Sequence, residues 1–165
     1  MSSSTDRIEK QTVLQAPLDR VWRAISDSKE FGTWFGVEFD GPFTAGATLK
    51  GRIVPTKVDP EVAKGQEPYA GYEFDCTVER VEPMRLFAIR WQPDVPEPGL
   101  DLSKAPTTLL EFELEEVADG TRLTITESGF DQIPIERRAK VFTRNEEGWE
   151  AQTKLIEKYL AGVQA

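Results

Sequence analysis

Hydrophobic and polar residues alternate along the middle of the chain, with the period of two that is typical of strands burying one face. The alternation is clearest in residues 72–78, 87–91 and 110–114. Further strands are predicted at residues 8–15, 47–54 and 121–130. The Asp119-Gly120 pair is a typical hairpin turn, and Glu82 to Arg85 forms another turn. The pattern therefore predicts an antiparallel sheet with one apolar face and one wet face.

The period changes to between three and four in two other parts of the chain, which indicates amphipathic helices. Near the N-terminus, a short helix is predicted over residues 18–25, and a second one, capped by Asp27 or Ser28, through Phe35. A long helix is predicted from about Pro134 onward. Its expected inward face consists of Ile135, Ala139, Phe142, Trp149, Ile156 and Leu160, with Leu155 and Tyr159 beside it. A helix of this length on an antiparallel sheet usually encloses a cavity.

Two connections, Pro55–Gly71 and Pro93–Pro106, are long and rich in proline. Loops of such length are uncommon in compact domains and are often functional, so we expect both to act as lids. Gly148 lies in the middle of the long helix, where glycine costs about 1 kcal/mol relative to alanine. It marks either a bend or a place where a strand or a ligand approaches the backbone.

Composition narrows the class of protein. The 165 residues are expected to form one domain, with residues 1–6 flexible. The net charge of −9 disfavours nucleic acid and anionic membrane surfaces as partners. No apolar run is long enough to insert into a membrane. Cys76 is the only cysteine, so an intramolecular disulfide is excluded and a reducing, cytoplasmic location is expected.

The residues that most enzymes need are missing. The chain contains no histidine, which excludes a Ser-His-Asp triad and histidine metal ligands. It contains no glycine-rich nucleotide motif, so neither a cofactor nor a metal is expected. Cys76 is interpreted as a small buried hydrophobic residue, because its strand neighbours are acidic. The basic residues at 137–144 and the acidic ones at 73–79 are interpreted as solvated faces.

Glu127 is the most informative polar residue. It shares the parity of Leu123 and Ile125, which aims it at the apolar face of the sheet, where a carboxylate needs hydrogen-bond donors. It is then either a polar anchor or a general base at a cavity. The alternative is that Glu127 lies at the end of its strand, where it faces water or caps the backbone near Gly129.

Several short motifs, taken in order, resemble one known family. They are Ala16-Pro17 with Val21-Trp22 and Ile25, Trp34-Phe35, Glu82-Pro83 before Leu86, Leu123-Thr124 with Glu127-Ser128-Gly129-Phe130, and Gly148-Trp149 with Leu155 and Tyr159-Leu160. This order resembles the helix-grip fold of the START-like (SRPBCC) superfamily, and most closely the bacterial proteins related to the activator of the heat-shock protein 90 ATPase. The resemblance implies an α+β fold in which a curved antiparallel sheet grips the long C-terminal helix around an elongated apolar cavity.

Members of the wider superfamily bind lipids, polyketides and other hydrophobic molecules, and some are cyclases or hydrolases. The resemblance places Trp34 near the mouth of the cavity, Trp149 at its floor, and Thr153 where relatives often have a large apolar residue. The candidate ligand-binding residues are Trp34, Phe35, Tyr72, Phe74, Phe87, Ile89, Trp91, Phe112, Glu127, Trp149 and Thr153. The aromatic ones have a second interpretation as ordinary core.

The leading hypothesis is a protein without catalytic activity that binds a small hydrophobic molecule. The alternatives are a polyketide cyclase or hydrolase with Glu127 as acid or base, and a module that interacts with a chaperone or acts in the stress response. The sequence is compatible with either a monomer or a homodimer.

Overall fold

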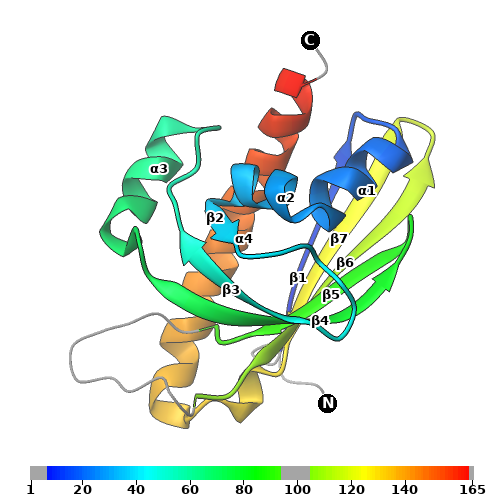
Figure 1. Cartoon of the computed structure of the whole chain (residues 1–165). Coiled ribbons are helices and arrows are strands. Elements are labelled where there is room, and N and C mark those ends of the chain that lie inside the picture. The colour runs from blue at the N-terminus through cyan, green and yellow to red at the C-terminus, as the bar shows by residue number, and fades with distance from the viewer. Residues whose placement is uncertain (1–6, 94–104, 164–165) are drawn as a thin grey trace.

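The computed structural model describes residues 7–93 and 105–163, which form a curved antiparallel sheet around one long helix (Figure 1). The elements are β1 (Arg7–Leu14), α1 (Leu18–Ser26), α2 (Ser28–Phe35), β2 (Val37–Phe39), β3 (Thr48–Ile53), α3 (Pro60–Gln66), the 3₁₀ turn η1 (Glu67–Tyr69), β4 (Glu73–Glu82), β5 (Leu86–Trp91), β6 (Thr108–Val117), β7 (Gly120–Ser128), the 3₁₀ turn η2 (Phe130–Gln132) and α4 (Ile135–Val163). Residues 1–6, for which flexibility was predicted, lie outside the described part.

The seven described strands lie in the order β1-β7-β6-β5-β4-β3-β2, and every neighbouring pair is antiparallel. Consecutive strands from β2 to β7 are neighbours, and β1 closes the far side against β7. The predicted alternation is confirmed on β7, where Leu123, Ile125 and Glu127 are all buried on one face. The register of β4 shifts between Val78 and Arg80, a bulge of the kind that bends and twists a sheet. The helix-grip fold is therefore confirmed.

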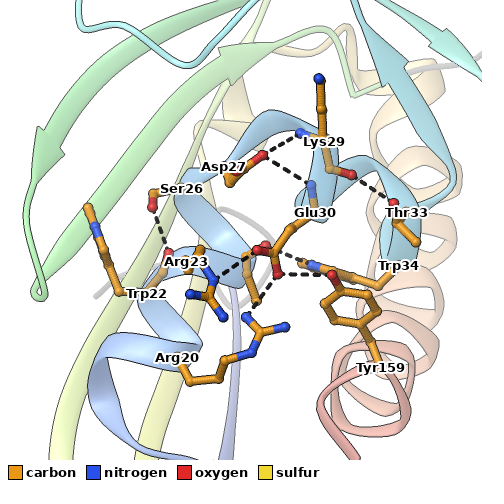
Figure 2. A network of polar contacts seen from close by, with 11 residues as sticks. Arg20, Trp22, Arg23, Ser26, Asp27, Lys29, Glu30, Thr33, Trp34 and Tyr159 are labelled. Atoms are coloured by element: carbon orange, nitrogen blue, oxygen red, sulfur yellow. Dashed lines mark hydrogen bonds and ion pairs between the residues drawn. The ribbon is translucent and has the colours of Figure 1, made fainter. Parts of the chain in front are cut away.

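The α1–α2 pair is fixed to the C-terminal part of α4 by a small polar network (Figure 2). Asp27 caps α2 by accepting from the N–H groups of Lys29 and Glu30, at 2.8 and 3.3 Å. The Glu30 carboxylate forms an ion pair with Arg20 of α1 at 2.8 Å and accepts a hydrogen bond from the Tyr159 hydroxyl of α4 at 2.9 Å. This half of α4 is consequently held against the two short helices.

The buried face of α4 agrees with the predicted one from Phe142 onward but not in the first turns of the helix. Trp149, Leu155, Ile156 and Leu160 are buried and Phe142 packs against the core, whereas Ile135 is 72% exposed and Ala139 is also exposed. The prediction for Ile135 and Ala139 is wrong, because the contacts of α4 with the core begin only at Val141.

The connection at residues 55–71 was predicted to be a loop, and this prediction is wrong. It contains α3 and η1, with Asp59 capping the helix by accepting from the N–H groups of Glu61 and Val62 and with Pro60 at the first position. The helix is short and has no buried residue, so it shows no apolar periodicity that could have revealed it. The other predicted lid, Pro93–Pro106, lies almost entirely outside the described residues.

Candidate ligand-binding site

A cavity of about 420 Å³ lies between the middle of α4, the ends of β3 to β5 and the segment α3–η1. The residues that line it are mostly aromatic or small. They are Phe35, Ile53, Val62, Gly65, Gln66, Tyr69, Tyr72, Phe74, Trp91, Gln92, Pro93, Arg144, Asn145, Gly148, Trp149, Ala151 and Gln152. A volume of this size falls within the range of cavities that hold small organic ligands.

Small residues on α4 create the space. Arg144, Gly148, Ala151 and Gln152 follow the spacing i, i+4, i+7, i+8, so they form one stripe along the helix. A Cβ atom built on Gly148 would meet no atom within 4 Å outside its own helix. Gly148 therefore does not serve the close approach of a strand. It leaves the backbone of α4 open to the cavity.

Aromatic rings from α2, β4, β5 and α4 form the wall beside this stripe. The indole rings of Trp91 and Trp149 are stacked, with their centroids 6.0 Å apart and their planes 28° apart. The ring of Phe35 lies 5.7 Å from each of them, and that of Phe74 lies 6.0 Å from Trp91. Phe74 is accommodated by Gly51 on β3, where a Cβ would lie 2.7 Å from its Cζ atom. These π-faces offer flat apolar contact area.

Glu127 lies behind this wall and is completely buried. Its Oε2 accepts from the Trp91 indole at 2.9 Å and from the Thr108 hydroxyl at 2.6 Å. Its Oε1 accepts from the Trp149 indole at 2.8 Å, and the Asn145 amide donates to both oxygens at 3.1 and 3.3 Å. The prediction that Glu127 faces the apolar side is confirmed, and the alternative in which it faces water is wrong.

The carboxylate of Glu127 thus fixes three side chains of the cavity wall without lining the cavity itself. Trp91, Asn145 and Trp149 come from β5 and α4, and one carboxylate on β7 orients all three. Because a buried carboxylate is stable only when its oxygens are hydrogen-bonded, the three donors and Glu127 depend on one another. Glu127 is a positioning residue for the wall.

The segment α3–η1 covers the cavity with Val62, Gly65, Gln66 and Tyr69. None of its residues is fully buried, but Val62 is half-buried and packs against the core, and polar contacts hold the two ends of α3. Gln66 donates to the carbonyl of Phe35 at 2.9 Å and accepts from the Thr56 N–H at 2.8 Å.

At the other end of α3, Asp59 accepts from Lys158 of α4 at 2.6 Å. This hydrogen bond from Lys158 is the main cause that lowers the pKa of Asp59. The side chain of Lys158 is 55% exposed and that of Asp59 is 18% exposed, and an ion pair so near the surface contributes little to stability. The cover is therefore held less firmly at Asp59 than at Gln66, whose hydrogen bonds are partly buried.

The structure brings five of the predicted site residues together around the cavity: Phe35, Tyr72, Phe74, Trp91 and Trp149. Trp34 lies in the core rather than at the mouth, with its indole donating to the carbonyl of Ala24 at 2.9 Å. Phe87, Ile89 and Phe112 are fully buried core residues. Thr153 is half-buried outside the cavity, and its hydroxyl donates to the carbonyl of Glu150 at 2.9 Å.

Several lining residues were not predicted. Val62, Gly65, Gln66 and Tyr69 were missed because α3 was taken for a loop. Asn145 and Arg144 had a usable signal, because they lie four residues before Trp149 and Gly148 respectively, and residues four apart are neighbours on a helix surface. In the described ranges, no cluster of acidic, cysteine or histidine side chains is arranged to hold a metal. None of the helices described is both long and apolar enough to cross a membrane.

The curved sheet, the long gripping helix and the cavity between them define a START-like (SRPBCC) domain. The pattern of the family described as Activator of Hsp90 ATPase homolog 1-like protein matches residues 15–161. The chain belongs to this family. No curated protein sequence is similar enough to the chain to count as a match.

Solved structures show the same fold at low sequence identity. A protein from Arthrobacter aurescens has a TM-score of 0.71 and 16% identity, covering 98% of this chain and 90% of the other. DynU16, encoded in the dynemicin biosynthetic locus, has a TM-score of 0.65 and 24% identity, covering 94% of this chain. The chain spans only 47% of DynU16. CalU16 from Micromonospora echinospora has a TM-score of 0.61 and 22% identity, covering 93% of this chain and 74% of the other.

Proposed function

We propose that this protein binds a small hydrophobic molecule, with a flat aromatic portion, in the cavity between α4, the ends of β3 to β5 and α3. The observation that carries the proposal is the cavity itself, which is walled by oriented aromatic rings and bordered by small residues on α4. Burial of apolar ligand surface would supply the affinity, at about 25 cal/mol per Å² before ordering costs. The segment α3–η1, which is held at Asp59 by an ion pair near the surface, would act as the cover that opens for entry.

The position of Glu127 favours binding over catalysis. A general base must reach the proton that it removes, through a hydrogen bond or one water. Both oxygens of Glu127 accept from wall residues, and the carboxylate does not line the cavity. This favours a binding protein over the cyclase or hydrolase alternative. A cytoplasmic location is part of the proposal, supported by the single cysteine.

The glycines of α4 provide a direct test. The change Gly148→Leu projects a side chain into the cavity from a position where a Cβ meets no neighbour. Gly162→Leu is the matched control, because Gly162 also lies in α4 with no atom near its Cβ position but outside the cavity. Binding is measured by the fluorescence of N-phenylnaphthylamine, a neutral aromatic probe.

We expect wild-type protein and Gly162→Leu to bind the probe with the same affinity. Gly148→Leu should bind it about tenfold or more weakly, since a lost apolar contact of 1.4 kcal/mol corresponds to a factor of ten. Equal affinity of the two variants, or no binding to the wild type, would contradict the proposal. Native mass spectrometry of gently purified protein provides an independent search for a retained ligand.

The family match supports a second candidate function, an interaction with a chaperone ATPase. The measurement is the ATPase rate of purified Hsp90 with and without this protein. A rate that rises in proportion to added protein would support this function, and an unchanged rate at several-fold excess would reject it.

A further inference from the structure

The charge that borders the cavity has the opposite sign to the net charge of the protein. The chain carries a net charge of −9, yet among the described lining residues Arg144 is the only one with a charged side chain. No aspartate or glutamate occurs among those lining residues. A cation at the border of an apolar cavity favours ligands that carry an anionic group, because a charge-assisted hydrogen bond is stronger than a neutral one.

Arg144 ends a basic segment of α4, and acidic residues follow it. Residues 135–144 contain four Arg or Lys residues and one acidic residue, Glu136, whereas Glu146 and Glu147 follow within three residues. Lys140 lies one helical turn before Arg144 but is exposed and outside the lining of the cavity, so salt screens its charge. The positive charge at the cavity border is that of Arg144. Arg144 takes part in another interaction within the chain, but a guanidinium has five N–H donors and can bind a further anion.

The buried carboxylate of Glu127 does not cancel the positive charge of Arg144 at the cavity surface. Glu127 is completely buried behind Trp91 and Trp149. Both of its oxygens accept hydrogen bonds, from four donors in all. A ligand in the cavity therefore meets indole faces and the guanidinium before it meets the carboxylate.

At the opposite end of the stripe on α4, the side chain of Gln152 provides a hydrogen-bond acceptor. The Nε2 atom of Gln152 donates to the carbonyl of Phe35 at 3.2 Å, while its Oε1 is buried and has no partner among the described residues. A buried acceptor without a donor is costly, and a ligand hydroxyl or N–H would satisfy it. Gln152 lies eight residues after Arg144, which separates their Cα atoms by about 12 Å along the helix.

We propose that the ligand is an elongated aromatic acid, with its anionic group at Arg144 and its ring system against Trp91 and Trp149. A hydroxyl or N–H at the far end would donate to Gln152. This inference rests on the proposed function, because it names the chemical class of the ligand for the same cavity. Arg144 is the residue that determines specificity for the acid.

Two fluorescent probes separate the charge from the apolar contact. Anilinonaphthalene sulfonate and N-phenylnaphthylamine share the same ring framework and differ by the anionic group. We expect Arg144→Gln to weaken binding of the sulfonate about tenfold, because a charge-assisted hydrogen bond contributes at least this factor. Binding of the neutral probe should change less than about twofold.

Lys140→Gln is the matched control, since it removes the same charge from the same helix at an exposed position outside the lining. It should leave both affinities within about twofold of the wild type, because exposed charges are screened by salt. Circular dichroism of both variants checks that the fold is retained.

The ratio of the two affinities is the decisive quantity. If Arg144→Gln leaves the ratio unchanged, or if Lys140→Gln alters it as much, the acid proposal is overturned while cavity binding stands. If the neutral probe fails to bind the wild type, the proposed function falls, and this inference falls with it.

Discussion

Two groups of aromatic side chains lie on the inner face of the same sheet. The rings of one group are packed on all sides (the closed group), while the rings of the other border a cavity. On β5, Phe87 and Trp91 have the same parity and are four residues apart. Phe87 is fully buried and its ring packs 6.4 Å from Phe31 of α2 and 4.7 Å from Phe43. Trp91 is half-buried and lines the cavity.

The layer opposite each group makes the difference. Phe31 of α2 has six other aromatic rings with centroids within 6.4 Å of its own. The space between α2 and Phe87 is therefore filled by side chains. Trp91 packs against Trp149 of α4 and the ring of Phe35, but the α4 residues that border the space beside these rings include Gly148 and Ala151, which have little or no side chain. The comparison shows that an inward aromatic residue becomes core or cavity wall according to the size of the side chain facing it.

The largest expected effect is on stability in the closed group. Phe31→Ala should destabilise the protein by about 3–5 kcal/mol, because a completely buried ring leaves a cavity that the surroundings cannot fill. Phe74→Ala, in the group that borders the cavity, should cost about 1–2 kcal/mol, since part of its ring contacts no protein. Urea unfolding of both variants provides the measurement. Equal losses would show that the two groups are packed alike.

The next effect concerns the carboxylate that orients the cavity wall. Glu127→Gln should cost about 2–3 kcal/mol, because the new amide N–H₂ faces donors where the carboxylate accepted. The near-ultraviolet circular dichroism of the tryptophans should change as well, since Trp91 and Trp149 lose a fixed orientation. Glu113→Gln, an exposed position on β6, serves as the control and should stay within about 0.5 kcal/mol. A small loss with an unchanged tryptophan signal would mean that Glu127 does not position the wall.

The smallest expected effect is a pH dependence of stability caused by Cys76, which lies at the boundary between the two groups. Cys76 lies on β4 between Phe74, which lines the cavity, and Val78, which is in the core, and burial raises the pKa of its thiol to about 12. The folded state therefore keeps its proton at pH values where the unfolded chain has lost it. The resulting stability is fully present below pH 9 and decreases as the pH rises from 9 toward 12.

Relative to Cys76→Ala, wild-type protein should lose about 1 kcal/mol of stability between about pH 8 and pH 10. At about pH 8 the thiol of the native protein should not react with an aromatic disulfide reagent. Rapid reaction without unfolding would show that the cavity extends past Phe74 to Cys76.

Most of the fold could be predicted from the sequence because the strands repeat a short local pattern. Residues 72–78 and 121–128 alternate in a way that only a half-buried strand satisfies, and the Asp119-Gly120 turn sets the pairing of β6 with β7. Glu127 could be placed on the inner face by parity alone. The start of the buried face of α4 was predicted less well, because Ile135 is apolar and yet 72% exposed.

The site was only partly predictable because it combines residues from separate segments. The donors to Glu127 come from β5, β6 and α4, and no spacing in the sequence relates Trp91 or Thr108 to Asn145. The helix α3 presents one apolar residue, Val62, to the core and is held at its ends by Gln66 and Asp59, which are ordinary surface residue types.

The sequence by itself determined which side chains point inward and which elements form, because alternation and helical period depend on near neighbours in the chain. Only the tertiary structure decided which inward residues are core and which border empty space. Packing density depends on the layer on the other side, here Phe31 before one part of the sheet and Gly148 before the other. That opposing layer comes from a distant part of the chain, so no local pattern can encode it.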